Sequence, residues 1–118
     1  MVTIQNKRGN IRITDDVITF LAGDAATNCF GVKGMAGKSR ESGIYQLLRR
    51  ESMSKGVSVT YNDDDSISIA LHIVVDQGVN VVALCSSIMN EVSYKLHDAT
   101  GVPVRSVDVY VDSMVMTD

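Results

Sequence analysis

The 118 residues, 45% hydrophobic and 21% charged, have the size and composition of one globular domain and exclude a disordered or fibrous chain. The net charge of −3 at pH 7 is not the strongly basic character expected of a dedicated nucleic-acid-binding protein. Residues 1–12 lack the apolar run of a signal peptide, and the best apolar run, residues 67–75, is too short to span a bilayer. We therefore expect a cytoplasmic protein that meets a membrane only indirectly.

The first predicted elements are a short strand and a helix. A turn at residues 9–10 precedes alternation of apolar and polar residues over residues 11–14, as in a half-buried strand. Thr14 or Asp15 then offers an oxygen that caps a helix, and apolar residues follow at helical spacing. We expect this helix to end near Gly31.

The next stretch is less regular. Three glycines within residues 31–37 permit a turn, a bulge or a close backbone approach. A brief helix is predicted from Ser39 or Ser42, and Gly56 closes it.

A β-hairpin is the clearest pattern in the chain. Apolar residues occupy the odd positions of residues 57–61 and 67–75, on either side of a polar turn. Since side chains alternate along a strand, these residues face one buried side, while Ser66, Ser68 and His72 face the other.

The last two elements are a long helix and a strand. Asn80 is expected to cap the helix, which carries apolar residues through Leu96 and stops at Gly101 and Pro103. In the final strand, residues 107, 109 and 111 point inward and residues 108, 110 and 112 outward. The order β-α-(turn-α)-β-β-α-β predicts one α+β domain over residues 1–118, with a small antiparallel or mixed sheet and two main helices packed on one face.

Several fragments in this order resemble the alkaline shock protein family. They are residues 9–18, Ala25-Ala26, residues 31–35, Gly56-Val57, residues 74–80 and residues 100–104, and together they extend over almost the whole chain. The resemblance implies a cytoplasmic protein of Gram-positive-type bacteria, linked to cell-envelope stress, that acts by association and has no enzymatic activity or cofactor. Short members are often encoded beside a kinase related to dihydroxyacetone and fatty-acid kinases, which suggests a role near lipid metabolism.

Charge is unevenly distributed and marks a candidate partner-binding segment. Between Lys33 and Lys55, six basic residues face two acidic ones, a local balance of +4, and the remainder of the chain carries −7. The segment is read either as a solvated face or as a surface for an acidic partner, a phosphorylated ligand or an anionic membrane. Its basic residues are Lys33, Lys38, Arg40, Arg49, Arg50 and Lys55.

An alternative function is RNA binding. Gly31 and Gly34 form the GxxG pattern of a KH domain, whose backbone clamps phosphates, but this use needs a helix on each side of the loop. The purely structural interpretation is that the glycines permit tight packing of the first helix against the sheet.

The remaining candidates are weaker. A second candidate surface is the solvent-facing side of the sheet, with His72 and Tyr110. His97, the other histidine, is expected to be a solvated or structural residue. No pattern indicates a nucleophile or metal site, so no catalytic or metal-binding residue is assigned. Cys29 and Cys85 are expected in helices as core thiols, and Asp63-Asp64-Asp65 as turn residues rather than cation ligands. The sequence thus favours a scaffold or adaptor that binds a protein partner and self-associates.

Overall fold

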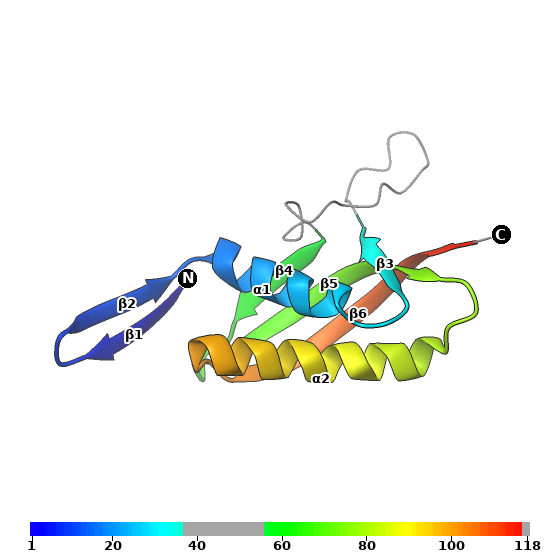
Figure 1. The fold of residues 1–118 in the computed structure, drawn as a ribbon. Coiled ribbons are helices and arrows are strands. Elements are labelled where there is room, and N and C mark those ends of the chain that lie inside the picture. The colour runs from blue at the N-terminus through cyan, green and yellow to red at the C-terminus, as the bar shows by residue number, and fades with distance from the viewer. Residues whose placement is uncertain (37–55, 117–118) are drawn as a thin grey trace.

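A computed structural model describes residues 1–36 and 56–116 (Figure 1). The class is α+β, as predicted, although the order of elements differs in part from the prediction. The strands β1 and β3 were not predicted, and the brief helix expected from Ser39 or Ser42 lies outside the described residues. The elements are β1 (Val2–Asn6), β2 (Gly9–Ile13), α1 (Asp15–Thr27), β3 (Val32–Met35), β4 (Val57–Tyr61), β5 (Ile67–Asp76), α2 (Val81–Thr100) and β6 (Val104–Val115).

The main sheet is built around β5, with which its other strands pair. Strands β3 and β4 both pair antiparallel with one edge of β5, where β4 meets residues 67–71 and β3 meets residues 73–75. Strand β6 pairs parallel with the other edge. Parallel neighbours need a crossover, and α2 supplies it between β5 and β6. Of the two predicted alternatives, antiparallel or mixed, the main sheet is therefore mixed.

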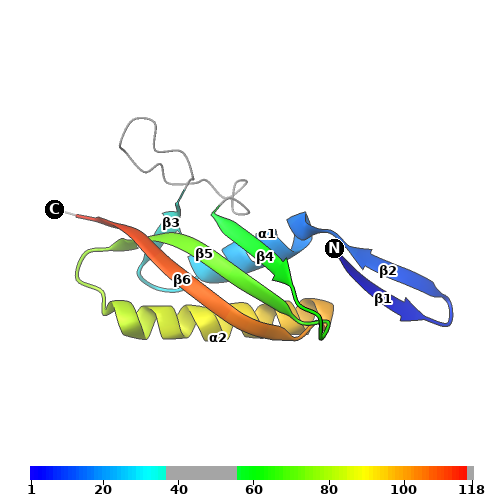
Figure 2. The same cartoon turned by 180° about the vertical axis from the view of Figure 1, so that it is seen from behind.

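Both helices lie on one face of this sheet, as predicted. Figure 1 shows α1 and α2 in front of the strands, and Figure 2 shows the strands in front of the helices. The odd-numbered residues of β5 are buried against the helices, which confirms the predicted alternation. The helix side of the core comprises Ile18, Ala22, Ala25 and Ala26 of α1 with Leu84, Ile88, Val92 and Leu96 of α2.

Helix α1 is shorter than predicted. Thr14 does occupy the N-cap position, but its side chain makes no capping hydrogen bond. The helix ends at Thr27, where the Thr27 hydroxyl donates to the backbone carbonyl oxygens of Gly23 and Asp24 at 3.0 and 3.1 Å. The expected end near Gly31 was thus four residues too late, since the C-cap residue is Asn28 rather than a glycine.

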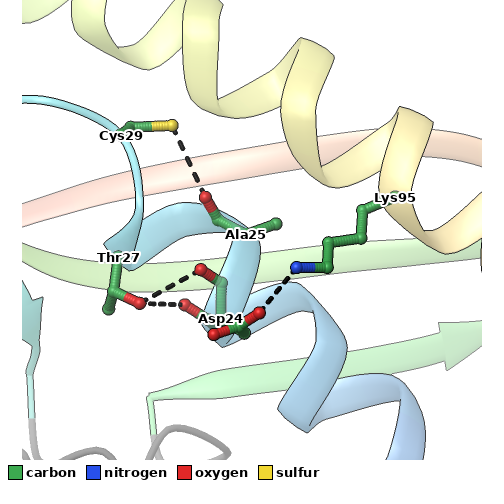
Figure 3. Close-up of polar contacts among 6 residues, drawn as sticks. Asp24, Ala25, Thr27, Cys29 and Lys95 are labelled. Carbon is green, nitrogen blue, oxygen red and sulfur yellow. Dashed lines mark hydrogen bonds and ion pairs between the residues drawn. The ribbon is translucent and has the colours of Figure 1, made fainter.

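Helix α2 follows the prediction closely. The Asn80 side chain accepts a hydrogen bond from the Ala83 backbone N–H at 3.0 Å, and the helix stops before Gly101. An ion pair joins the two helices: the Lys95 ammonium lies 2.6 Å from the Asp24 carboxylate (Figure 3). The Asp24 side chain is only 16% exposed, so this pair is more shielded than an ordinary surface ion pair.

The N-terminal residues form a hairpin that the sequence did not predict. Strands β1 and β2 pair with each other in a separate two-stranded sheet, with Asn6 opposite Gly9. The expected turn at residues 9–10 is wrong, since the turn is Lys7-Arg8 and Gly9 already belongs to β2. Here the Asn6 side chain accepts a hydrogen bond from the Arg8 backbone N–H at 2.8 Å and so stabilises the turn.

Candidate binding surface on the open face of the sheet

The face of the sheet opposite the helices is turned toward the viewer in Figure 2. On β5 the residues of this face are Ser68, Ala70 and His72, which alternate with the buried residues of the same strand. Cross-strand pairing places Tyr110 of β6 directly opposite His72. The open face predicted from the sequence is therefore present, and His72 and Tyr110 lie together on it. Ser66, which was predicted for the same face, is instead buried.

His72, Tyr110 and Asp112 form an ordered cluster on this face. The rings of His72 and Tyr110 are stacked, with centroids 4.6 Å apart and an interplanar angle of 10°. The His72 Nδ1 atom lies 2.9 and 3.2 Å from the two carboxylate oxygens of Asp112. Because a carboxylate only accepts hydrogen bonds, we assign a proton to Nδ1, and in the neutral imidazole Nε2 is then the acceptor.

A β-bulge brings Asp112 into this cluster. The pairing of β5 with β6 shifts between the Ile73–Val111 and Val74–Ser113 pairs, so Asp112 has no partner on β5. The released residue turns its carboxylate to His72 and keeps only 14% of its side chain exposed, whereas His72 keeps 37%. The alternation in the sequence predicted that Asp112 lies on this face. The contact between Asp112 and His72 could not be predicted, because a β-bulge has no recognisable pattern in the sequence.

The cluster offers an aromatic surface with fixed hydrogen-bonding groups. Tyr110 is 49% exposed, although its ring is held by the stack. Tyrosine combines a large contact area with a hydroxyl, and it is enriched among the residues that dominate binding energy at protein interfaces. Because neighbouring side chains already restrain these groups, less conformational entropy remains to be lost on binding.

The predicted basic segment is described only at its beginning. Lys33 lies on β3 at an irregularity in its pairing with β5, and its ammonium is 3.4 Å from the Asp76 carboxylate. Asp76 therefore partly compensates the charge of Lys33. The other predicted residues, Lys38, Arg40, Arg49, Arg50 and Lys55, lie outside the described residues.

The structure contradicts the KH-like interpretation of Gly31 and Gly34. Residues 32–35 form strand β3, so the second helix that a GxxG phosphate clamp requires is replaced by a strand. Gly31 instead permits close packing, since a Cβ atom there would lie 2.9 Å from Cγ1 of Val79. This contact is to the connection between β5 and α2, not between the first helix and the sheet as expected.

The three consecutive aspartates, Asp63, Asp64 and Asp65, lie in the turn between β4 and β5. The Asp64 carboxylate accepts hydrogen bonds from the hydroxyl and the backbone N–H of Ser66, and these bonds, that of the hydroxyl most, lower the Asp64 pKa. Asp65 adopts a positive φ of 66°, which aspartate tolerates better than most residues. Within residues 1–36 and 56–116, no group of three or more His, Cys, Asp or Glu residues is arranged to hold a metal ion.

The cysteines are less buried than predicted. Cys85 lies in α2, but Cys29 follows the end of α1, and both are only partly buried. The Cys29 thiol donates to the Ala25 carbonyl oxygen at 3.5 Å (Figure 3). Burial raises the pKa of both thiols, and the charge of Glu91 adds to the effect at Cys29.

The described residues thus define a small α+β domain with helices on one face of a mixed sheet and a polar aromatic cluster on the other. Residues 3–116 match the alkaline shock protein family, which has a cell envelope-related function, and the chain belongs to this family. The match confirms the resemblance inferred from the sequence.

The chain is also similar to proteins of two bacteria. It is 32% identical to the uncharacterized protein YloU of Bacillus subtilis strain 168, over 99% of this chain and 98% of YloU. It is 38% identical to the uncharacterized protein Spy1614 of Streptococcus pyogenes serotype M6, over 96% of this chain and 93% of Spy1614. No solved structure matches the chain significantly. None of the helices in the described part of the chain is long and apolar enough to cross a bilayer.

Proposed function

We propose that this chain is a non-enzymatic cytoplasmic scaffold or adaptor that serves the cell envelope-related function of its family by binding a protein partner and by self-association. The observation that supports the proposal best is the Tyr110–His72–Asp112 cluster on the open face of the sheet. Its side chains are restrained before any partner binds, and they combine an exposed ring with a directed hydrogen-bond acceptor.

In this proposal, the partner is a protein with an aromatic or hydrogen-bonding side chain that contacts Tyr110 and His72. The first candidate to test is a kinase of the fatty-acid or dihydroxyacetone type, because the family resemblance suggests that link. In this proposal, contact with a membrane is indirect and passes through the bound partner.

Affinity capture from the native lysate, followed by calorimetry with the purified captured protein, tests the proposal. We expect Tyr110→Ala to weaken binding about tenfold or more, as for a central aromatic residue of an interface. Tyr94→Ala is the matched control, since Tyr94 is an exposed tyrosine on α2. Equal binding by Tyr110→Ala, His72→Ala and the control would exclude the sheet face as the binding surface.

The same assay tests the basic segment separately. An Arg49→Glu/Arg50→Glu variant that loses the partner, while Tyr110→Ala retains it, assigns binding to that segment. Clean capture that repeatedly recovers no protein would refute the adaptor proposal as a whole.

A further inference from the structure

The β1–β2 hairpin projects from the rest of the domain as an arm (Figures 1 and 2). Its four apolar residues face one side, because Val2 pairs with Ile13 and Ile4 pairs with Ile11. Val2 and Ile13 pack against the core, but Ile11 is 49% exposed. A two-stranded hairpin is at best marginally stable in water without packing on one face. Ile4, in the same outer half of the arm, is half-buried, so Ile11 is the apolar side chain of the arm that the described residues leave most exposed.

The arm and the rest of the domain carry opposite charges. Residues 1–13 contain Lys7, Arg8 and Arg12 and no acidic residue, a net charge of +3. The other described residues, 14–36 and 56–116, contain three basic and eleven acidic side chains, a net charge of −8. Electrostatic complementarity therefore favours a second copy of this chain as the binding partner of the arm.

Strand β6 offers a matching acceptor on the second copy. It has 12 residues and, among the described strands, pairs only with β5, so its other edge presents unpaired backbone N–H and C=O groups. Val107 and Val109 face the helix side of the sheet, and the exposed Asp108 faces the open side. Strand β2 has the same alternation, with Ile11 and Ile13 on one side and Arg12 on the other.

We infer that β2 of one copy adds antiparallel to the free edge of β6 in a second copy. This inference rests on the proposed self-association and names the two surfaces that produce it. The pairing places Ile11 beside Val109 on one face and Arg12 beside Asp108 on the other, so apolar residues meet apolar residues and opposite charges meet. The same register brings the basic turn of the arm close to Asp112.

The geometry predicts an open-ended assembly. The arm and the β6 edge are different surfaces of one chain, so each copy donates one arm and accepts another in a head-to-tail arrangement. The added strand β2 has only five residues, which makes the contact small and the association weak. Exposed ion pairs are screened by salt, so the association should also weaken as salt rises.

Sedimentation velocity over a concentration series tests the inference. For the native chain we expect the average mass to rise with concentration, past that of a dimer, and to fall at high salt. Arg12→Glu and Asp108→Arg should each weaken association about fivefold, because each replaces an attractive pair by a repulsive one. Asp98→Arg is the matched control, which makes the same charge change as Asp108→Arg on α2 and should leave association unchanged.

A charge exchange makes the test specific for this pair. The Arg12→Glu/Asp108→Arg double variant should regain association, since opposite charges again meet. Carbodiimide treatment of an isotopically mixed native sample should couple Lys7 of one copy to Asp112 of another.

Three results would overturn the inference. In the first, the double variant associates no better than the single variants. In the second, the average mass of the native chain does not rise beyond that of a dimer. In the third, the arm binds anionic phosphatidylglycerol vesicles while the protein stays monomeric. Self-association that is unaffected by both Arg12→Glu and Asp108→Arg refutes this geometry but not the proposed scaffold. A native chain that stays monomeric at every concentration and salt refutes self-association itself, while partner binding through Tyr110 is measured independently.

Discussion

Gly56 is the position where one added methyl group is expected to be most disruptive. It lies where β3 and β4 meet the same residue of β5: the His72 N–H donates to the Gly56 carbonyl oxygen at 2.8 Å, and the His72 carbonyl oxygen accepts from the Ala36 N–H at 2.9 Å. A Cβ atom on Gly56 would lie 2.5 Å from the Ala36 carbonyl oxygen and 3.2 Å from that of His72. Both atoms belong to the backbone, so the strands must move apart to accept alanine.

Gly56→Ala combines two costs that a matched variant separates. The φ of 78° costs about 1–2 kcal/mol for a residue with a side chain, and forcing a methyl group into a filled space costs a further 1–3 kcal/mol or so. Gly78 has a similar φ of 91°, but a Cβ atom added there would meet no atom within 4 Å, so Gly78→Ala should show only the first cost.

Urea unfolding followed by circular dichroism measures the difference. With a denaturant dependence of about 2 kcal/mol per molar urea, Gly56→Ala should lower the midpoint by about 1–2.5 M and Gly78→Ala by about 0.5–1 M. Equal losses in the two variants would show that the close approach at Gly56 is not a constraint on the sheet. Because the His72 backbone is one of the groups displaced, Gly56→Ala should also weaken partner binding at the His72–Tyr110 cluster.

Three further predictions concern the two helices and a tyrosine. Asn80→Ala should destabilise the domain by about 1 kcal/mol and Thr14→Ala by much less, because only Asn80 caps its helix through its side chain; urea unfolding compares them. Lys95→Met should cost about 1 kcal/mol by leaving the shielded Asp24 carboxylate without its cation, and adding Asp24→Asn should recover most of that loss. Burial and a hydrogen bond to the Asp15 carboxylate raise the Tyr61 pKa to about 12. The contribution of Tyr61 to stability is therefore complete below its ordinary pKa of 10.0 and is lost as pH rises through about 12. Tyr61→Phe should remove the titration step near pH 12 from an ultraviolet titration of the folded protein.

Features carried by local patterns were predictable from the sequence. The alternation in β5 and the Asn80 cap of α2 each follow from neighbouring residues, and the structure confirms both. The β1–β2 hairpin was missed because its Lys7-Arg8 turn lacks the Asn-Gly or Asp-Gly pair that marks most two-residue hairpins.

Features that depend on distant parts of the chain were not predictable. Strand β3 is a short strand that contains a glycine, and its pairing with β5 rather than local propensity makes it a strand. The same holds at the candidate surface. Alternation placed His72 and Tyr110 on one face, whereas the Asp112 contact arises from a bulge between two strands separated by a whole helix.

The two proposed surfaces share β6, and this has a thermodynamic consequence. Tyr110 and Asp112 project from β6 onto the open face, while the backbone edge of the same strand would accept the arm of a second copy. An arm whose basic turn lies near Asp112 competes with His72 for that carboxylate, so assembly and partner binding must influence each other, reciprocally and by the same factor. The dissociation constant for the partner should therefore change as the protein concentration passes through the range of self-association. In Asp108→Arg, which should assemble about fivefold more weakly, the same change should require about fivefold more protein, and a constant value in both proteins would show that the two surfaces act independently.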